Sequence, residues 1–158
     1  MLAGAGRCAG CGRTFCVVAM AWDDSDREAA RDRLVEVAGA LPDVEVEDSY
    51  GHTGFRLRGT RFAWLLVDHH GDGRLALWVR APKGEQQSLV AADPARYFVP
   101  PYVGAQGWVG VLVDPGSEPD WDEIAVLVQQ AWRMGATKRA LSAYDEARAA
   151  EGARPGAP

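Results

Sequence analysis

Two adjacent prolines, Pro100 and Pro101, limit what the second half of this chain can fold into. Proline fixes φ at roughly −65° and lacks an amide hydrogen, so neither a helix nor a central strand can run through the pair. The prolines lie in the segment from Arg96 to Val113, which reads RYFVPPYVGAQGWVGVLV. Aromatic residues flank them, and the apolar run after Trp108 has the length of a strand. The segment therefore predicts an irregular, aromatic-rich connection that leads into a strand.

The length and composition are those of a single globular domain. The chain has 158 residues, of which 47% are hydrophobic and 25% charged, which is ordinary for a domain that buries a core. No apolar run approaches the roughly 20 residues that a membrane-spanning helix needs. The formal net charge is −5, which does not favour a polyanion as a partner.

Charge is distributed unevenly along the chain. Residues 20–50 contain ten acids and three bases, and residues 84–158 contain ten acids and six bases. Residues 51–83 contain only two acids, Asp68 and Asp72, against six bases. The sequence therefore has a basic middle between two acidic flanks.

The first 19 residues show no hydrophobic periodicity, and we expect 1–19 to be an unstructured leader, with Met20 as a possible true start. The only cysteines, Cys8, Cys11 and Cys16, all lie there. Cys8 and Cys11 form a C-x-x-C pair, but structural zinc takes four ligands and no second pair or histidine lies nearby, so we predict no metal site. Without cysteines the body cannot form a disulfide, which is typical of a cytoplasmic protein.

Amphipathic helices are predicted on both sides of the central part. Ser25 and Glu28 have the spacing of a capping box, and apolar residues then recur at helical spacing, which predicts a helix over about 26–40 that Pro42 ends. The run from Ile124 to Trp132 predicts a second helix. Thr137 to about Ala149 predicts a short third one.

Between these helices, from Val44 to Val113, the pattern changes to alternating residues, which indicates strands. Phe55 and Leu57 alternate with two arginines on a half-exposed strand, and Gly59-Thr60 has the form of a type II′ turn. The apolar run 61–67 predicts a central strand, and 84–92 a short helix. The strand over 74–80 is expected to turn Leu75, Leu77 and Val79 toward the core, and to place on its other side Arg74, Ala76, Trp78 and Arg80.

The predicted fold class is α+β: two layers, with an antiparallel β-meander packed by N- and C-terminal helices. We expect one domain over residues 20–145 and a disordered tail over residues 146–158.

Four stretches resemble the MmcQ/YjbR family, small bacterial proteins usually described as DNA-binding. They are SYGHTGFRLRG at 49–59, Val79-Arg80, the segment 97–113, and residues 131–140, which include Thr137-Lys-Arg. Family members commonly show an aromatic-Gly-His-Pro-x-Phe segment, a Gly-Lys turn, a Phe-x-Pro-Pro…Gly-Trp-Val segment and a Pro-Lys-Arg. Here Thr53 and Thr137 stand where proline is usual, and Thr60-Arg61 replaces Gly-Lys.

The resemblance covers most of residues 25–145. It implies a two-layer unit of the frataxin-like (CyaY-like) kind, with β-hairpins proposed to act as wings on DNA. It provides no catalytic residue.

The arginines of the meander suggest a nucleic-acid surface. Arg56 and Arg58 are expected on one strand face with Arg61 across the turn, where each phosphate contact would displace a counterion. Trp78 could stack on an unpaired base. The candidate site comprises Arg56, Arg58, Arg61, Arg74, Trp78, Arg80 and Lys83. The open alternative is that the arginines pair with the acids of residues 20–50 and that a helix covers Trp78.

A second hypothesis is a protein- or small-ligand-binding module with no affinity for nucleic acid. Its groove would be lined by His52, Tyr97, Tyr102 and Trp108. These residues also have structural interpretations: His52 could bond a loop carbonyl, and the aromatic residues of 97–102 could form a packed lid over the sheet. His69 and His70 read as solvated residues of a glycine-rich turn.

An enzyme is not predicted. The sequence contains no Gly-rich phosphate loop, no G-x-S-x-G and no metal-spaced pair of histidine and acid, and its body has no cysteine. We therefore expect a cytoplasmic binding protein without cofactor, metal or membrane contact, whose partner is DNA, another protein or a small ligand.

Overall fold

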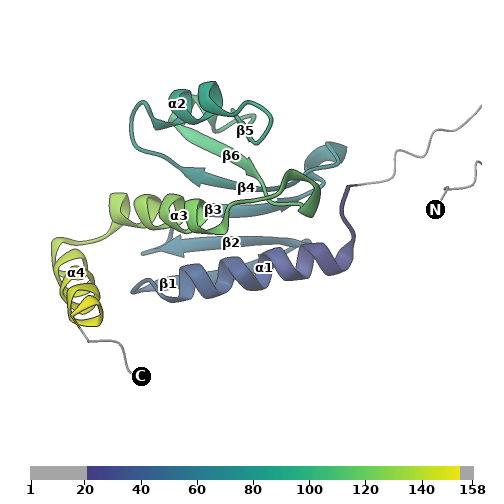
Figure 1. Cartoon of the computed structure of the whole chain (residues 1–158). Helices are drawn as coiled ribbons and strands as arrows, with labels where there is room; N and C mark the ends of the chain where they lie inside the picture. The colour runs from purple at the N-terminus through teal and green to yellow at the C-terminus, as the bar shows by residue number, and fades with distance from the viewer. Residues whose placement is uncertain (1–20, 154–158) are drawn as a thin grey trace, which may run out of the picture.

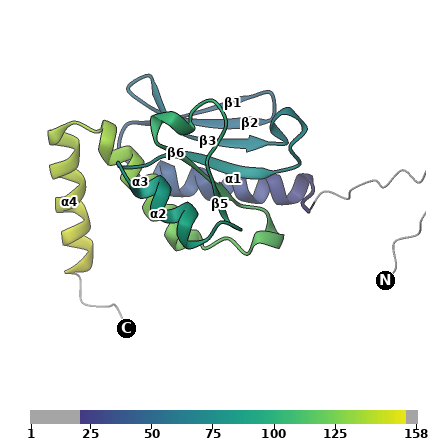
Figure 2. The same ribbon diagram turned by 90° about the horizontal axis from the view of Figure 1, so that it is seen from above.

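The computed structural model describes residues 21–153, in which six antiparallel strands form one sheet and four helices accompany it (Figures 1 and 2). The strand order is β1-β2-β3-β4-β6-β5. The strands are β1 (Val44–Ser49), β2 (His52–Leu57), β3 (Thr60–Val67), β4 (Leu75–Arg80), β5 (Tyr97–Phe98) and β6 (Trp108–Leu112). The helices are α1 (Asp24–Gly39), α2 (Glu85–Ala92), α3 (Trp121–Gly135) and α4 (Lys138–Gly152). The α+β prediction is confirmed.

The predictions at the two ends of the chain have different outcomes. The leader 1–19, with its cysteines, and Met20 lie outside the described residues, as do residues 154–158. Helix α4 continues to Gly152, so the prediction of a disordered tail from residue 146 is wrong up to there. Between residues 21 and 153, no helix is long and apolar enough to span a bilayer.

One face of the sheet, called here the inner face, packs against α1 and α3 (Figure 2). Helix α1 buries Ala30, Leu34 and Ala38, the stripe that the 3.6-residue period predicted. Helix α3 buries a wider stripe that ends at Trp132, which is completely buried. The Nε1–H of Trp132 donates to the Pro42 carbonyl at 2.9 Å, so this tryptophan fastens α3 to the chain just after α1.

The start of α1 differs from the prediction. Asp23, not Ser25, is the N-cap, and its carboxylate accepts from the amides of Ser25 at 2.8 Å and Asp26 at 3.1 Å. The Asp26 carboxylate accepts from the Asp23 amide at 2.9 Å. The predicted box of Ser25 and Glu28 is therefore wrong, because an aspartate two residues earlier caps equally well and has an acid three positions later to complete the box.

The turn between β2 and β3 also differs from the prediction. Arg58 and Gly59 both have positive φ, 53° and 77°, as a type I′ turn requires. The predicted type II′ turn at Gly59-Thr60 is wrong, because Thr60 already belongs to β3 and pairs with Leu57. This register keeps Leu57 in the core. It also leaves Arg58 at the hairpin tip and not on the strand face beside Arg56.

A bulge in β3 places Arg61 on the outer face of the sheet, the face opposite α1 and α3. Phe55 pairs with Ala63 and Arg56 with Arg61, so Phe62 is an extra residue. Simple alternation would put Arg61 on the inner side with Ala63. Instead Phe62 joins Ala63 in the inner core, and the Arg61 guanidinium lies over the ring of Trp64.

The outer face is covered over β4 and β6 by the segment that contains Pro100 and Pro101. Leu66, Ala76, Trp78 and Trp108 form a second buried cluster there, and Phe98 and Val103 pack against it. Gly110 makes this possible, since a Cβ on it would lie 2.3 Å from the Phe98 ring. The outer face of β1, β2 and the start of β3 has no such cover among the described residues and is called here the open face.

Candidate functional site

Acidic residues gather at one end of the sheet, here called the acidic end. Helix α1 begins there, and α3 runs in the same direction but begins beside the middle of α1, where Arg33 lies over the ring of Trp121, the first residue of α3 (Figure 1). The turn between β3 and β4 is at the same end, since the Nε1–H of Trp22 donates to the Gly73 carbonyl at 2.9 Å. Acids are favourable at helix N-termini, where the backbone amides are unpaired. This end carries Asp23, Asp24, Asp26, Glu28, Asp68, Asp72, Asp114, Glu118, Asp120, Asp122 and Glu123.

The opposite end of the sheet, here called the basic end, carries Arg58, Arg80, Lys83, Lys138 and Arg139. Arg58 is the tip of the β2–β3 hairpin and Arg80 ends β4, which pairs with the start of β3. The end of α3 reaches the same place, because a Cβ on Gly135 would lie 3.3 Å from Leu57. Lys83 and Met134 line one cavity of about 470 Å³, which places Lys83 near the end of α3.

The cations of the basic end are not neutralised by close acids. Within residues 21–153, no carboxylate lies within 4.0 Å of the charged nitrogens of any of the five, although Asp43 and Glu85 are at the same end. Because close acids do not neutralise these five cations, this end is positive in an otherwise acidic molecule. It is suited to bind an anionic partner.

The predicted arginine surface is divided between three places. Arg58, Arg80 and Lys83 belong to the basic end. Arg74 lies toward the acidic end, where its guanidinium is 4.4 Å from the centroid of the Phe98 ring. Arg56 and Arg61 lie on the open face and share the carboxylate of Glu47 on β1, at 2.8 and 3.4 Å. The alternative that arginines pair with acids of residues 20–50 is thus correct for these two, although no helix between residues 21 and 153 covers them.

Trp78 cannot stack on a base in this fold. Only 2% of it is exposed, in the second cluster, and the His69 ring lies edge-on to it at 5.0 Å. The prediction that Trp78 belongs to a nucleic-acid surface is therefore wrong. The prediction of its side of β4 was correct, but the Pro-Pro segment and His69 cover that side, not a helix.

The alternative ligand groove is not formed. Tyr97 is buried in the inner core, Trp108 is buried in the second cluster, and Tyr102 is 79% exposed. His52 is further away, at the start of β2. These four residues do not line a common cavity. The lid interpretation holds for Phe98 and Val103, not for Tyr97.

Burial also sets the proton affinity of Tyr97. Removal of its hydroxyl from water, together with the nearby Glu123 carboxylate, raises the pKa of Tyr97 far above its usual value. The phenol is therefore neutral and is not an activated acid or base.

The three histidines are close together at the ends of β2 and β3. The ring centroids of His52 and His69 are 6.1 Å apart, and those of His69 and His70 are 4.1 Å apart. His52 Nδ1 accepts from the Val67 amide at 3.0 Å, so the neutral ring carries its proton on Nε2. His52 is thus structural, but its partner is a strand amide and not the loop carbonyl that we predicted. His69 is half-buried against Trp78 and is not simply solvated.

Burial lowers the pKa of His52 below its usual value, and the charge of His69 lowers it further. The pKa of His69 is lowered by burial and by His70, against a smaller opposite effect of Asp72. Both rings therefore favour the neutral form. The described residues contain no group of three histidines, cysteines or acids that could hold a metal.

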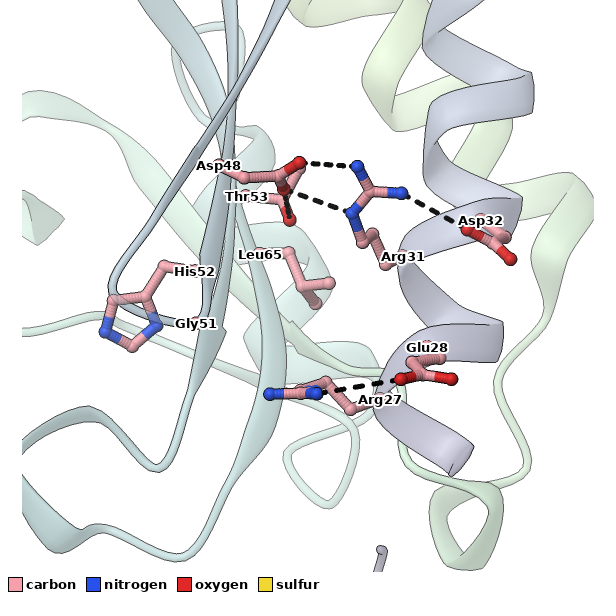
Figure 3. Close-up of a pocket in the computed structure, with 9 residues that line it drawn as sticks. All are labelled: Arg27, Glu28, Arg31, Asp32, Asp48, Gly51, His52, Thr53 and Leu65. Carbon is pink, nitrogen blue, oxygen red and sulfur yellow. Dashed lines mark hydrogen bonds and ion pairs between the residues drawn. The ribbon is translucent and has the colours of Figure 1, made fainter. Parts of the chain in front are cut away.

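A cavity of about 490 Å³ lies between α1 and the β1–β2 hairpin (Figure 3). Asp48 is engaged there by two donors, the Arg31 guanidinium, with Nε at 3.1 Å, and the Thr53 hydroxyl at 2.7 Å. These bonds hold the pKa of Asp48 below its usual value. Arg27 extends from α1 toward Gly51. Its Nη2 lies 3.7 Å from the Asp24 carboxylate. Most polar groups that line the cavity bind one another, and these contacts hold the β1–β2 hairpin against α1. They leave no activated nucleophile or base among the lining residues.

Comparisons with known proteins agree with this architecture. The family model described as YjbR matches residues 39–134, more than half of the chain. The chain belongs to the YjbR family. No curated protein matches it.

A solved YjbR-type structure shares the fold. The crystal structure of Deinococcus radiodurans protein DR2400, with a DUF419 domain, has a TM-score of 0.57 and 18% sequence identity, and the match covers 73% of this chain and 87% of that chain. At this identity the likeness shows the fold alone.

Sequence reasoning missed three residues of this YjbR-family chain that matter for its charged surfaces. Lys138 and Arg139 stand out in the sequence only through the family resemblance, because nothing in it indicates that α3, which precedes them, ends beside the β2–β3 hairpin. Glu47 was counted as one acid of a flank. Its alternation with Val46 did place it on the solvent side of a strand, and this was the available signal.

Proposed function

We propose that this YjbR-family protein binds nucleic acid through the basic end, and that it does so as a cytoplasmic, non-enzymatic binding protein. The observation that carries the proposal is the separation of charge: five cations without close carboxylates among the described residues lie at one end of the sheet, and eleven of the 22 acids lie toward the other. The resemblance to a family described as DNA-binding supports the same partner. The hairpin tip at Arg58 has the form of a wing that follows a phosphate backbone.

Phosphate contacts would supply most of the affinity. Each lysine or arginine that neutralises a phosphate releases counterions, so the affinity falls with salt at a slope set by the number of contacts. Because phosphate contacts carry no direct sequence information, we expect little sequence preference. The overall charge of −5 would weaken distant attraction, and binding is expected only at low or moderate salt.

The test compares two variants of equal net charge. Arg58→Glu/Lys138→Glu reverses two cations of the basic end, whereas Arg33→Glu/Arg74→Glu reverses two exposed cations toward the acidic end. Fluorescence anisotropy with a labelled 20-base-pair duplex would be measured at about 50 and 200 mM salt. We expect the basic-end variant to lose at least about tenfold in affinity and close to two units of salt slope.

The matched variant is expected to stay within about threefold of the unsubstituted protein. Equal losses in both variants would mean that only net charge matters, and the basic end would not be the site. If the unsubstituted protein fails to bind at about 50 mM salt, the nucleic-acid proposal is wrong.

A further inference from the structure

Two arginines of the open face approach the same carboxylate oxygen. Arg56 Nε lies 2.8 Å and Arg61 Nη2 3.4 Å from Oε2 of Glu47. The three side chains come from adjacent strands of the sheet, and each is partly exposed, at 37%, 30% and 48%. Convergence of two guanidinium groups on one oxygen is the arrangement by which proteins bind an oxyanion, and here an internal carboxylate occupies it.

The position of Arg61 is fixed by its surroundings. The bulge at Phe62 turns it to the outer face, and its guanidinium lies 4.3 Å from the centroid of the Trp64 ring. Its side chain crosses β2 above Gly54, where a Cβ would be 3.0 Å from Arg61 Nε. Any side chain on Gly54 would displace it. The arginine is therefore held in place before any ligand arrives, which lowers the entropic cost of binding.

Glu47 leaves part of this donor set unused. The Nε atoms of Arg56 and Arg61 are both shielded from solvent, and neither makes a hydrogen bond of good geometry with any residue from 21 to 153. The contact of Arg56 Nε with Glu47 is close but poorly aligned for a hydrogen bond. The planar carboxylate of Glu47 therefore leaves donors of the two guanidinium groups without an acceptor. A tetrahedral phosphate offers more acceptor oxygens.

We propose that Arg56 and Arg61 form a phosphate clamp that Glu47 keeps closed in the free protein. A phosphate group enters between the two guanidinium groups, and the Glu47 carboxylate moves out to solvent. The phosphate can come from a free phosphate ion or from a nucleic-acid backbone, and the second source rests on the proposed function. The clamp shares no residue with the basic end, although Arg58 lies on the same hairpin, so each site can be changed without removing a residue of the other.

The experiment follows the side-chain Nε–Hε signals of Arg56 and Arg61 by ¹H–¹⁵N NMR during titration with inorganic phosphate. Glu47→Gln keeps the size of the side chain and removes its charge. Glu45→Gln removes the same charge from the same face of β1; Glu45 lies opposite Arg56 in the strand register, but its carboxylate is not within 4.0 Å of either guanidinium group in the described structure. We expect Glu47→Gln to tighten phosphate binding about fivefold, the factor that one unit charge about 4 Å away gives in water.

Glu45→Gln is expected to stay within about twofold of the unsubstituted protein, and adding Arg61→Gln to Glu47→Gln should remove the gain. If the two arginine signals do not shift in Glu47→Gln, or if Glu45→Gln gives the same gain, the clamp is refuted. The shift of both signals with phosphate alone would support a free-ion clamp.

A second titration uses a single-stranded oligonucleotide of eight bases. Shifts of the same two signals in Glu47→Gln would support the backbone as the phosphate source. In the Arg58→Glu/Lys138→Glu background, oligonucleotide affinity should fall while the response to inorganic phosphate persists. If the oligonucleotide binds but the Nε–Hε signals of Arg56 and Arg61 do not shift, the clamp is refuted and the proposed function stands.

Discussion

Gly110 lies directly beneath the ring of Phe98, and the contact depends on the missing side chain. A Cβ at this position would be 2.3 to 2.6 Å from three atoms of the ring. Phe98 in turn carries the Arg74 guanidinium on its face and closes one side of the second cluster. Because Gly110 has no Cβ, the Pro-Pro segment can pack against the sheet.

We expect Gly110→Ala to lower the free energy of unfolding by about 1–3 kcal/mol, because Phe98 must leave its place or the strand must shift. Chemical denaturation measures this. The control is Gly39→Ala at the end of α1, where a Cβ would meet no atom within 4 Å. Alanine there should be neutral or stabilising by up to about 1 kcal/mol. Similar values for the two variants would contradict the role of Gly110.

His52 should make stability depend on pH. Because its pKa is lowered in the folded protein, the unfolded chain binds more protons near and below the ordinary value of 6.5. Stability from this group is therefore complete above that pH and falls as the pH drops below it. Protonation of Nδ1 also abolishes its bond from the Val67 amide.

The test is His52→Asn, whose amide oxygen can accept from Val67 but does not titrate. We expect the variant to lose less stability than the unsubstituted protein when urea denaturation is compared at about pH 7.5 and pH 5.5. The same loss in both proteins would show that His52 does not contribute.

At the scale of the elements, α1 and α3 are each started by an aspartate. The Asp120 carboxylate accepts from the amides of Asp122 at 3.0 Å and Glu123 at 3.1 Å, and Asp23 does the same for α1. A side-chain cap satisfies amides that the helix itself cannot. It also fixes the residue at which each helix begins.

Replacement of Asp120 by alanine should lower the stability by about 1 kcal/mol, the usual value of an N-cap. Asp24→Ala is the matched control, because it removes an acid from the first turn of α1 without removing a cap. Its effect should stay below about 0.5 kcal/mol. Thermal unfolding of the two variants would decide, and a larger loss for Asp24→Ala would refute the assignment of the caps.

Periodicity predicted most of these elements, since burial of one face imposes a period of two on strands and 3.6 on helices. It also predicted which side of β4 Trp78 occupies. It could not predict that residues 99–107 fold over this side, because the contact joins segments that are distant in sequence. The bulge at Phe62 was equally hidden, since alternation alone puts Arg61 on the wrong face.

For the candidate site, local composition identified Arg58, Arg80 and Lys83 as part of a basic segment. It did not show that Arg56 and Arg61 would share Glu47, because that pairing depends on strand register. Local composition also did not show that Lys138 lies at the basic end, because that position depends on the length of α3. Charge counts describe a segment, and the fold decides which charges become neighbours.

For the whole molecule, one sheet supports two buried clusters. The inner cluster under α1 and α3 and the second cluster under the Pro-Pro segment share strands β3, β4 and β6. Leu77 and Trp78, for example, are adjacent on β4 but belong to different clusters. Loss of either cluster therefore removes support from the strands that hold the other.

The molecule should accordingly unfold as one unit. Tryptophans lie in both clusters, Trp132 in the inner one and Trp78 in the second, so fluorescence reports both, whereas far-UV circular dichroism reports the helices and the sheet. The two transitions in urea are expected to coincide. Separate midpoints would show that the Pro-Pro side opens before the helical side.

The separation of charge between the two ends of the sheet has an effect that reaches beyond the surface of the protein. Carboxylates toward one end and cations without ion pairs at the other give the described part of the chain a permanent electric dipole moment, which the oppositely directed peptide dipoles of α1 and α3 offset only in part. The electric field of a negatively charged polymer would rotate the protein before the two molecules touch. It would arrive already turned with the Arg58 hairpin leading, although its total charge alone would repel it.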